Sequence, residues 1–183
     1  MDGVHRVAAL KKLGVKRIPA CLVDYTNPNI RVLHWYRTLA GKSNLDSVIT
    51  RIIESEISME QTERINLKHI GVPPIVAAIR FRDKNFLVKS SFQNLKEAYD
   101  IIRRIEDQFK DMGFILRYET EADALESLRS GHCNAVICTP KLSKEKIIKA
   151  AVSGRVFGPK TSRHIIPARP MRLNVPLSLL RND

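Results

Sequence analysis

The chain has 183 residues, of which 44% are hydrophobic and 27% are charged, a composition that is ordinary for a globular protein with a buried core. It has no run of about 18 apolar residues and no apolar signal-peptide core, which argues against a membrane span and a secretory leader. The net charge of +12 favours an anionic partner, although scattered basic residues also serve solubility. The three cysteines are odd in number and lack metal-site spacing, so we expect a reducing cytoplasm.

The first half of the chain predicts helices separated by two strands. Apolar spacing and cap residues predict helices after residue 3, over 44–57, and (as helix or turn) over 59–70. Residues 17–25 are apolar on both faces, which predicts a buried strand with neighbours on either side. A second strand is predicted over 30–36, a loop over 38–43, and a domain boundary at Pro73-Pro74.

The second half is more regular. Residues 75–82 and 86–91 flank Asp83-Lys84-Asn85 and predict a hairpin. Capping residues predict three helices, which begin after Asn94, Thr120 and Ser143 and end at Gly113, Gly131 and Gly154. Strands are predicted over 114–119 and 134–139. This order of strands and helices predicts a small α/β sandwich.

The opening stretch Asp2-Gly3-Val4-His5-Arg6 can hold an anion. Gly3 permits a tight turn, and the free amides of the following helix point at the loop. His5 and Arg6 are cations at the positive end of the helix dipole, which a stability argument would disfavour, so the pattern favours a functional reading. The alternative is a surface helix that Asp2 merely caps.

A second basic stretch lies near the other end of the chain, in Gly158-Pro159-Lys160-Thr161-Ser162-Arg163-His164. Hydroxyl and guanidinium groups in such a loop suit a phosphate or a carboxylate, although a solvated basic connector is the plainer interpretation. Trp35 is the single tryptophan and is predicted on a strand, either in the core or flanking a pocket. No Walker loop, nucleophile elbow or His-Glu-x-x-His motif is present.

Together these stretches resemble a known family. Residues 1–25 resemble the Asp-Gly-x-His-Arg loop and helix of the ParB/sulfiredoxin superfamily, which includes partition proteins, sulfiredoxins and small-molecule kinases. Residues 154–167 and 173–180 are similar to the C-terminal signature of the free L-serine kinases, and Trp35 falls where those kinases carry a tryptophan. The resemblance spans nearly the whole chain in the right order.

The resemblance implies an α/β (α+β) fold with a ParB/sulfiredoxin-like lobe at 1–72 and a small α/β domain at 73–183 that closes the site. It implies phosphoryl transfer from ADP or ATP to free L-serine, giving O-phospho-L-serine for cysteine or siderophore synthesis, with Mg²⁺. Val4 departs from the histidine of archaeal members and agrees with a bacterial, ATP-using member, so the donor stays open.

The resemblance also implies roles for single residues. Gly3, Val4, His5 and Arg6 would hold the transferring phosphate, and Asp2 would contact magnesium or the serine hydroxyl. Trp35 would form part of the serine pocket. The serine carboxylate or phosphate would bind the second basic stretch, at Lys160, Thr161, Ser162, Arg163 and His164.

Two further expectations follow from the family. Its kinases carry an N-terminal lobe before the Asp-Gly-x-His-Arg motif, with a glutamate thought to act as general base, so we expect that this chain lacks that lobe. A ParB-like DNA-binding or regulatory protein is the alternative; it would need a helix-turn-helix from the helices at 44–57 and 59–70. A sulfiredoxin-like reductase is disfavoured, because Val4 occupies the place where that chemistry needs cysteine.

Overall fold

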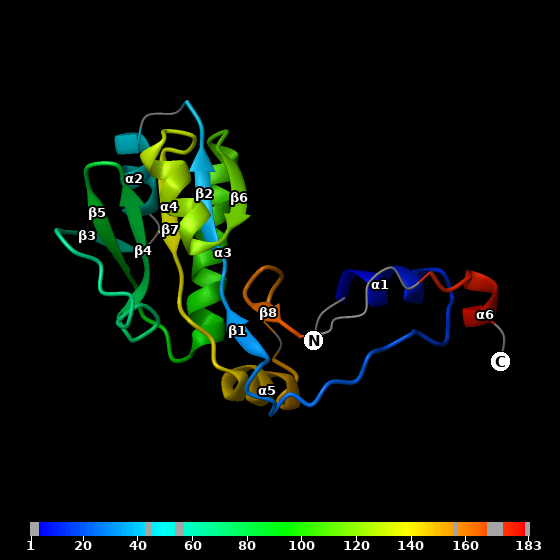
Figure 1. Cartoon of the computed structure of the whole chain (residues 1–183). Helices are drawn as coiled ribbons and strands as arrows, with labels where there is room; N and C mark the ends of the chain where they lie inside the picture. Colours follow the sequence, from blue (N-terminus) through cyan, green and yellow to red (C-terminus); the bar gives the residue numbers. More distant parts are fainter. Residues whose placement is uncertain (1–3, 43–44, 54–56, 156, 168–173, 182–183) are drawn as a thin grey trace. The chain divides into compact units, whose positions relative to one another are not determined.

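The computed structural model describes residues 4–42, 45–53, 57–155, 157–167 and 174–181. The chain forms two compact units: unit 1 comprises Met1–Arg31 with His164–Asp183, and unit 2 comprises Val32–Arg163 (Figure 1). The mixture of helices and strands confirms the predicted α/β class. The division at residues 72 and 73 is a different partition and stays a prediction.

Unit 2 is built on a six-stranded antiparallel sheet with the strand order β3-β5-β4-β7-β2-β6. The strands are β2 (Tyr36–Ala40), β3 (Ser58–Thr62), β4 (Ile75–Phe81), β5 (Asn85–Lys89), β6 (Ile115–Glu119) and β7 (Ala135–Cys138). β4 and β5 are the predicted hairpin, with Ile79 opposite Phe86. The centre of the sheet, β4-β7-β2, joins strands that are far apart in the sequence.

Helices cover the two faces of this sheet, with α3 and α4 on opposite faces (Figure 1). α2 (Leu45–Ile53) and α3 (Leu95–Asp111) pack on the face that carries the larger apolar core, which we call the α3 face. α4 (Glu121–Arg129) packs on the other face, the α4 face, over β2 and β7. α5 (Lys144–Val152) follows β7 and has no fully buried residue.

The capping predictions are confirmed for α3, α4 and α5. The Asn94 side chain accepts a hydrogen bond from the Glu97 amide, as the predicted N-cap requires. The Glu97 carboxylate accepts its hydrogen bond from the amide of Gln93, one residue before the cap, and not from the Asn94 amide of a strict capping box. Thr120 and Ser143 cap α4 and α5 as Asn94 caps α3. The helix ends are also determined locally, because Gly113 and Gly131 adopt the positive φ that glycine accepts without strain.

Two sequence predictions in unit 2 are wrong because strand pairing overrides local pattern. Residues 58–62 form β3, an edge strand paired with β5, and not part of a helix or turn over 59–70. The predicted strand at 30–36 is divided between β1 (Arg31–Leu33) and β2, which extends through residues 38–40 of the predicted loop. β2 is buried along nearly its whole length because β6 and β7 flank it.

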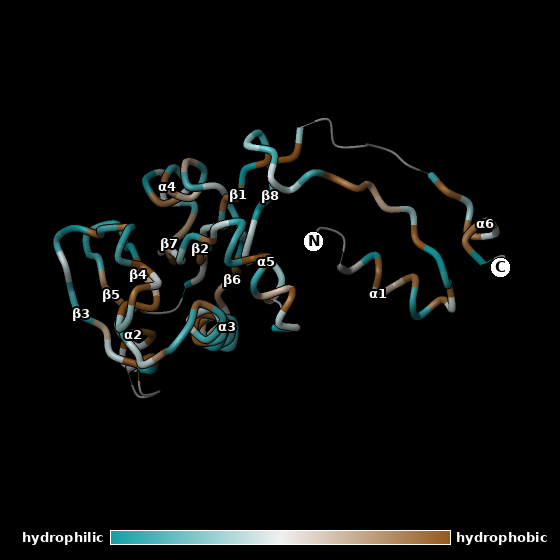
Figure 2. Tube along the Cα trace, turned by 90° about the horizontal axis from the view of Figure 1, so that it is seen from below, coloured by the Kyte–Doolittle hydropathy of each residue, from teal (hydrophilic) through white to brown (hydrophobic). Residues whose placement is uncertain are grey.

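Unit 1 contains α1 (Val4–Lys12), a long extended segment and α6 (Leu177–Arg181). The helix after the opening loop is confirmed, with Gly14 at φ 69° after its end. The predicted strand at 17–25 is wrong: no strand is assigned there, and Leu22 is 94% exposed. Figure 2 shows this hydrophobic stretch between α1 and β1. Its apolar pattern would suit burial, but no strand of the described chain pairs with it. Within the described residues, no helix is both long and apolar enough to span a membrane.

Candidate anion-binding site at Trp35

Two basic side chains lie over Trp35 in unit 2. Trp35 is half-buried and lies between β1 and β2. The Lys160 Nζ atom lies 5.4 Å from the centroid of the indole, and the Arg163 guanidinium carbon lies 5.3 Å from it. Both distances fall within cation–π range. Residues predicted from two separate parts of the sequence are therefore brought together.

In the part of the chain that the structure describes, this pair of cations has no acidic partner. Among the described residues, neither Lys160 nor Arg163 makes an ion pair with a carboxylate. Lys160 is exposed and Arg163 is half-buried, so both groups remain accessible. Two unpaired cations on one aromatic face attract an anion, and the guanidinium can bind a carboxylate or phosphate with two hydrogen bonds.

Lys160 lies in a loop with a defined backbone, and Arg163 is the first residue of the strand β8 (Arg163–Ile165). Lys160 has φ 59°, a left-handed conformation that is uncommon outside glycine. The Thr161 hydroxyl donates to the Gly158 carbonyl at 2.8 Å, and Thr161 is only 3% exposed. A Cβ atom at position 158 would meet the guanidinium of Arg103, so a larger residue there would displace the Arg103 side chain. These contacts hold Lys160 in a conformation that costs about 1–3 kcal/mol, as is common at binding sites.

A buried ion pair supports Trp35 from the α3 face. Arg37 Nε lies 2.7 Å from Glu106 Oε1, and the two side chains are 3% and 7% exposed. Arg37 Nη1 donates to the Trp35 carbonyl at 2.6 Å and to the Thr139 hydroxyl at 3.2 Å. Thr139 in turn donates to the same carbonyl at 3.1 Å. The backbone of Trp35 is therefore bound by two buried side chains.

Two tyrosines complete this buried network. Tyr118 donates to Glu106 Oε2 at 3.0 Å, and burial together with the Glu106 charge raises the pKa of Tyr118 to about 12. Its ring lies 5.9 Å from Lys160 Nζ. Tyr99 donates to the Pro140 carbonyl at 2.6 Å and lies 3.5 Å from the Thr161 carbonyl. Burial raises the pKa of Tyr99 too, so both phenols stay neutral donors.

The other predicted site residues are placed as follows. Asp2 and Gly3 lie outside the described residues. Val4 and His5 are in the first turn of α1, and Arg6 follows them there with an exposed side chain. Ser162 is half-buried next to Thr161. His164, in unit 1, has Nε2 2.7 Å from the Tyr25 hydroxyl.

Sequence reasoning missed Arg37, Glu106, Tyr99, Tyr118 and Thr139. One signal was present: Glu106 falls within the apolar stripe of α3, four residues after Ile102 and three before Phe109. A carboxylate on the buried face of a helix needs a buried partner. Its partner, Arg37, is 69 residues earlier in the chain, and nothing local relates the two.

The described residues offer no ready metal site. They contain no cluster of three His, Cys, Asp or Glu side chains that could hold a metal ion. The three cysteines are free, and burial raises the pKa of Cys133 to about 11 and that of Cys138 to about 12. These two thiols are therefore protonated near neutral pH and are poor metal ligands.

Comparison with known proteins relates the chain to serine kinases. No protein-family model matches the sequence. An ADP-dependent L-serine kinase of Thermococcus kodakarensis is 29% identical over 187 residues, which cover 98% of this chain and 72% of that protein. An ATP-dependent L-serine kinase of Desulfurococcus mucosus is 27% identical, covering 99% of this chain and 71% of that protein. A ParB-like protein of Sulfolobus acidocaldarius is 24% identical over 90% of this chain and 67% of that protein.

Comparison of the fold with solved structures also relates the chain to serine kinases. The structure of a free serine kinase mutant in complex with AMP superimposes with a TM-score of 0.82 at 27% identity. The match covers 98% of this chain and 72% of that one. A conserved hypothetical protein from Pyrococcus furiosus matches with a TM-score of 0.78 at 26% identity, over 98% of this chain and 75% of that one. The chain is thus a relative of the free L-serine kinases, as its motifs predicted.

Proposed function

We propose that this protein transfers a phosphoryl group from ADP or ATP to free L-serine, giving O-phospho-L-serine. The observation that carries the proposal is the pair of unpaired cations, Lys160 and Arg163, on Trp35. This pair lies in a chain that matches L-serine kinases along nearly its full length. The serine hydroxyl oxygen would bond to the terminal phosphorus while the bond to the bridging oxygen breaks and the hydroxyl proton is released, leaving AMP from ADP or ADP from ATP.

The described geometry favours a carboxylate-binding role for the Trp35 site. Arg163 would bind the serine carboxylate with two hydrogen bonds, Lys160 would add charge, and the indole would pack against the small side chain. Thr161 shapes the loop through its bond to Gly158, and Ser162 and His164 would add hydrogen bonds to carboxylate or phosphate. The amides of α1 with Gly3, Val4, His5 and Arg6 would hold the transferring phosphate.

Magnesium and cellular context belong to the proposal as well. Mg²⁺ usually keeps several waters and binds through one or two carboxylates and the substrate phosphates, so a three-ligand protein cluster is not needed. Asp2 is the carboxylate we assign to it or to the serine hydroxyl. When bound, the ion would neutralise charge on the nucleotide phosphates. We place the reaction in the cytoplasm, where its product would serve cysteine synthesis.

Turnover with each donor tests the proposal. The purified chain is incubated with L-serine, Mg²⁺ and either ADP or ATP, and O-phospho-L-serine is measured by mass spectrometry. Arg163→Ala should lower kcat/KM for L-serine by about a hundredfold, as expected for loss of one charged contact. Arg104→Ala, which removes an exposed arginine on α3, is the matched control and should be neutral.

Binding provides a second readout that does not need turnover. Trp35 is the single tryptophan, so its fluorescence reports L-serine at the proposed site directly. Saturable quenching that disappears in Arg163→Ala is the expected result. Absence of both product and serine-dependent fluorescence change would contradict the kinase proposal.

DNA binding is the alternative, and the Sulfolobus ParB-like relative and the +12 charge support it. The helix-turn-helix that it requires is not formed by the expected segments, because residues 58–62 are the strand β3. Duplex DNA binding with a steep salt dependence would favour this alternative, and its absence at low salt would dismiss it.

A further inference from the structure

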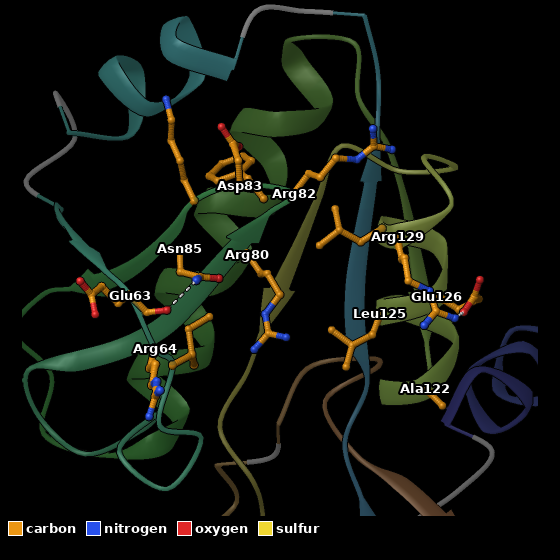
Figure 3. Close-up of a pocket in the computed structure, with 14 residues that line it drawn as sticks. Glu63, Arg64, Arg80, Arg82, Asp83, Asn85, Ala122, Leu125, Glu126 and Arg129 are labelled. Carbon is orange, nitrogen blue, oxygen red and sulfur yellow. Dashed lines mark hydrogen bonds and ion pairs between the residues drawn. The ribbon is translucent and has the colours of Figure 1, made fainter.

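A basic hollow lies on the α4 face of unit 2, and none of its residues belongs to the Trp35 site. It has a volume of about 980 Å³ and is lined by β4, the β4–β5 turn, the segment after β3, and α4 (Figure 3). On this face α4 packs mainly over β2 and β7, and the hollow lies beside the helix. Nothing in the proposed kinase function uses it.

Arg80 occupies the centre of this hollow. It lies two residues after Ala78 on β4, so the two side chains point to the same face of the sheet, and Ala78 belongs to the core of the α4 face. Figure 3 shows its guanidinium directed away from β4 into the space between Arg64 and Arg129. Arg80 Nε is buried and has no hydrogen-bond partner among the described residues. A buried, unpaired guanidinium donor is costly, so its position calls for a ligand.

Two more arginines approach from other segments. Arg64 follows β3, and Arg82 follows β4. Neither makes an ion pair with a carboxylate in the part of the chain that the structure describes. The Arg82 guanidinium lies against Gly131, where a Cβ atom would come within 2.7 Å of it, so this glycine makes room for the arginine.

The remaining charges define what can bind. The lining has five cations, Arg64, Arg80, Arg82, Lys84 and Arg129, and three carboxylates, Glu63, Asp83 and Glu126. One of these carboxylates is already paired, since Glu126 binds Arg129. The excess of positive charge favours an anion, and the carboxylates disfavour a long polyanion that would pass over all of them.

We infer that this hollow binds a small phosphate-bearing molecule through Arg64, Arg80 and Arg82. Its volume is that of a small-molecule site, and guanidinium groups suit phosphate oxygens. Nucleic acid fits less well, because the one aromatic residue of the lining, Phe81, is only 4% exposed and offers no surface for stacking bases. Inorganic phosphate and a phosphorylated metabolite share this chemistry.

Calorimetric titration tests the inference. All titrations use the full chain carrying Lys160→Met and Arg163→Met, which removes the cations of the Trp35 site. The probes are inorganic phosphate, O-phospho-L-serine (chosen because it is the proposed product) and ATP. Saturable binding of at least one phosphate probe is expected, and because the proposed phosphate loop at residues 3–6 is still present, the part of the binding assigned to the hollow is the part that the arginine substitutions weaken. Adding Arg80→Met or Arg64→Gln should weaken it about ten- to a hundredfold, the loss of one charge-assisted hydrogen bond.

A charge-matched control makes the result decisive. Arg104→Met removes an exposed arginine on α3, outside the hollow, and should leave binding unchanged. Because Arg64 is exposed, Arg64→Gln is expected to fold normally and keeps the test valid if Arg80→Met does not fold. Equal binding of inorganic phosphate and O-phospho-L-serine identifies the phosphate group as sufficient, and tighter O-phospho-L-serine binding identifies a phosphoamino acid.

The inference and the kinase proposal fail separately. No binding of any probe, or equal binding by Arg64→Gln, Arg80→Met and Arg104→Met, would overturn the inference whether or not the unsubstituted chain phosphorylates serine. Loss of serine turnover alone leaves the arginine hollow untouched, because the titrations measure binding without catalysis.

Discussion

Two arginines on neighbouring regions of one sheet have opposite surroundings. Arg37 on β2 faces α3 and is bound by Glu106, by the Trp35 carbonyl and by Thr139. Arg80 on β4 faces the other side, and its Nε has no partner among the described residues. The buried charge of Arg37 on the α3 face is therefore neutralised within the protein, whereas Arg80 on the α4 face has no carboxylate partner among the described residues.

This difference distinguishes Arg37, which supports the Trp35 site, from Arg80, which is available to bind a ligand. Arg37 fixes the backbone under Trp35 and leaves Lys160 and Arg163 to meet an anion. Among the described residues Arg80 Nε has no partner, and Arg64 and Arg82, which make no ion pair there either, line the same hollow. Removing a partner should therefore damage the α3 face severely and the α4 face hardly at all.

The largest expected effect is on the α3 face. Glu106→Leu strands the Arg37 charge in the core and should lower the free energy of unfolding by about 3–5 kcal/mol. Arg37→Met combined with Glu106→Leu should regain much of this loss, because neither charge is then buried alone. Urea denaturation measures both. The surface carboxylate variant Asp107→Leu should change stability by less than about 0.5 kcal/mol.

Equal destabilisation by the single and double variants would show that packing, and not the unpaired charge, explains the loss at Glu106.

The next prediction distinguishes the role of Lys160 in binding from its effect on stability. Lys160→Gly removes the cation over Trp35 and also relieves the left-handed backbone at φ 59°. Activity with L-serine should fall by about a hundredfold, while thermal stability should stay the same or rise slightly. Lys160→Met should lose activity equally without any gain in stability. Normal kcat/KM in both variants would remove Lys160 from the site.

A third prediction uses pH on the α4 face. Burial, followed by the charge of Lys141, lowers the pKa of His34 to about 4. Because this pKa is lower in the folded than in the unfolded chain, the unfolded chain gains a proton first as the pH falls below 6.5. The free energy of unfolding should therefore be unaffected by His34 above pH 6.5 and should decrease as the pH falls toward 4. After allowance for solvent screening, roughly 2 kcal/mol should be lost over that window.

Unfolding of the unsubstituted chain and of His34→Gln at several pH values isolates this contribution. The variant should show a flatter pH dependence between pH 6.5 and 4, and parallel curves would contradict the assignment to His34.

The smallest expected effect completes the comparison. Without phosphate, Arg80→Met removes a buried unpaired donor and should raise the free energy of unfolding by about 1 kcal/mol, in contrast to the loss at Glu106. Phosphate should stabilise the unsubstituted chain and not the variant, which reverses their order. Chemical denaturation with and without phosphate measures this. A large loss of stability in Arg80→Met without ligand would show a structural role instead.

Local chemistry predicted much of the fold. The N-caps at Asn94, Thr120 and Ser143 and the hairpin around Asp83-Lys84-Asn85 were correct because each signal lies within a few residues of its effect. Strands that depend on distant partners were harder to predict. β3 is mostly polar and becomes a strand by pairing with β5.

The candidate site divides in the same way. By itself the sequence identified Trp35, Lys160 and Arg163, since residue type and a basic loop are local properties. Only the tertiary structure placed both cations on one indole, paired Arg37 with Glu106, and left Arg80 unpaired in a hollow. Whether a charge is neutralised depends on which distant segment packs against it, and that is decided by the order of strands in the sheet.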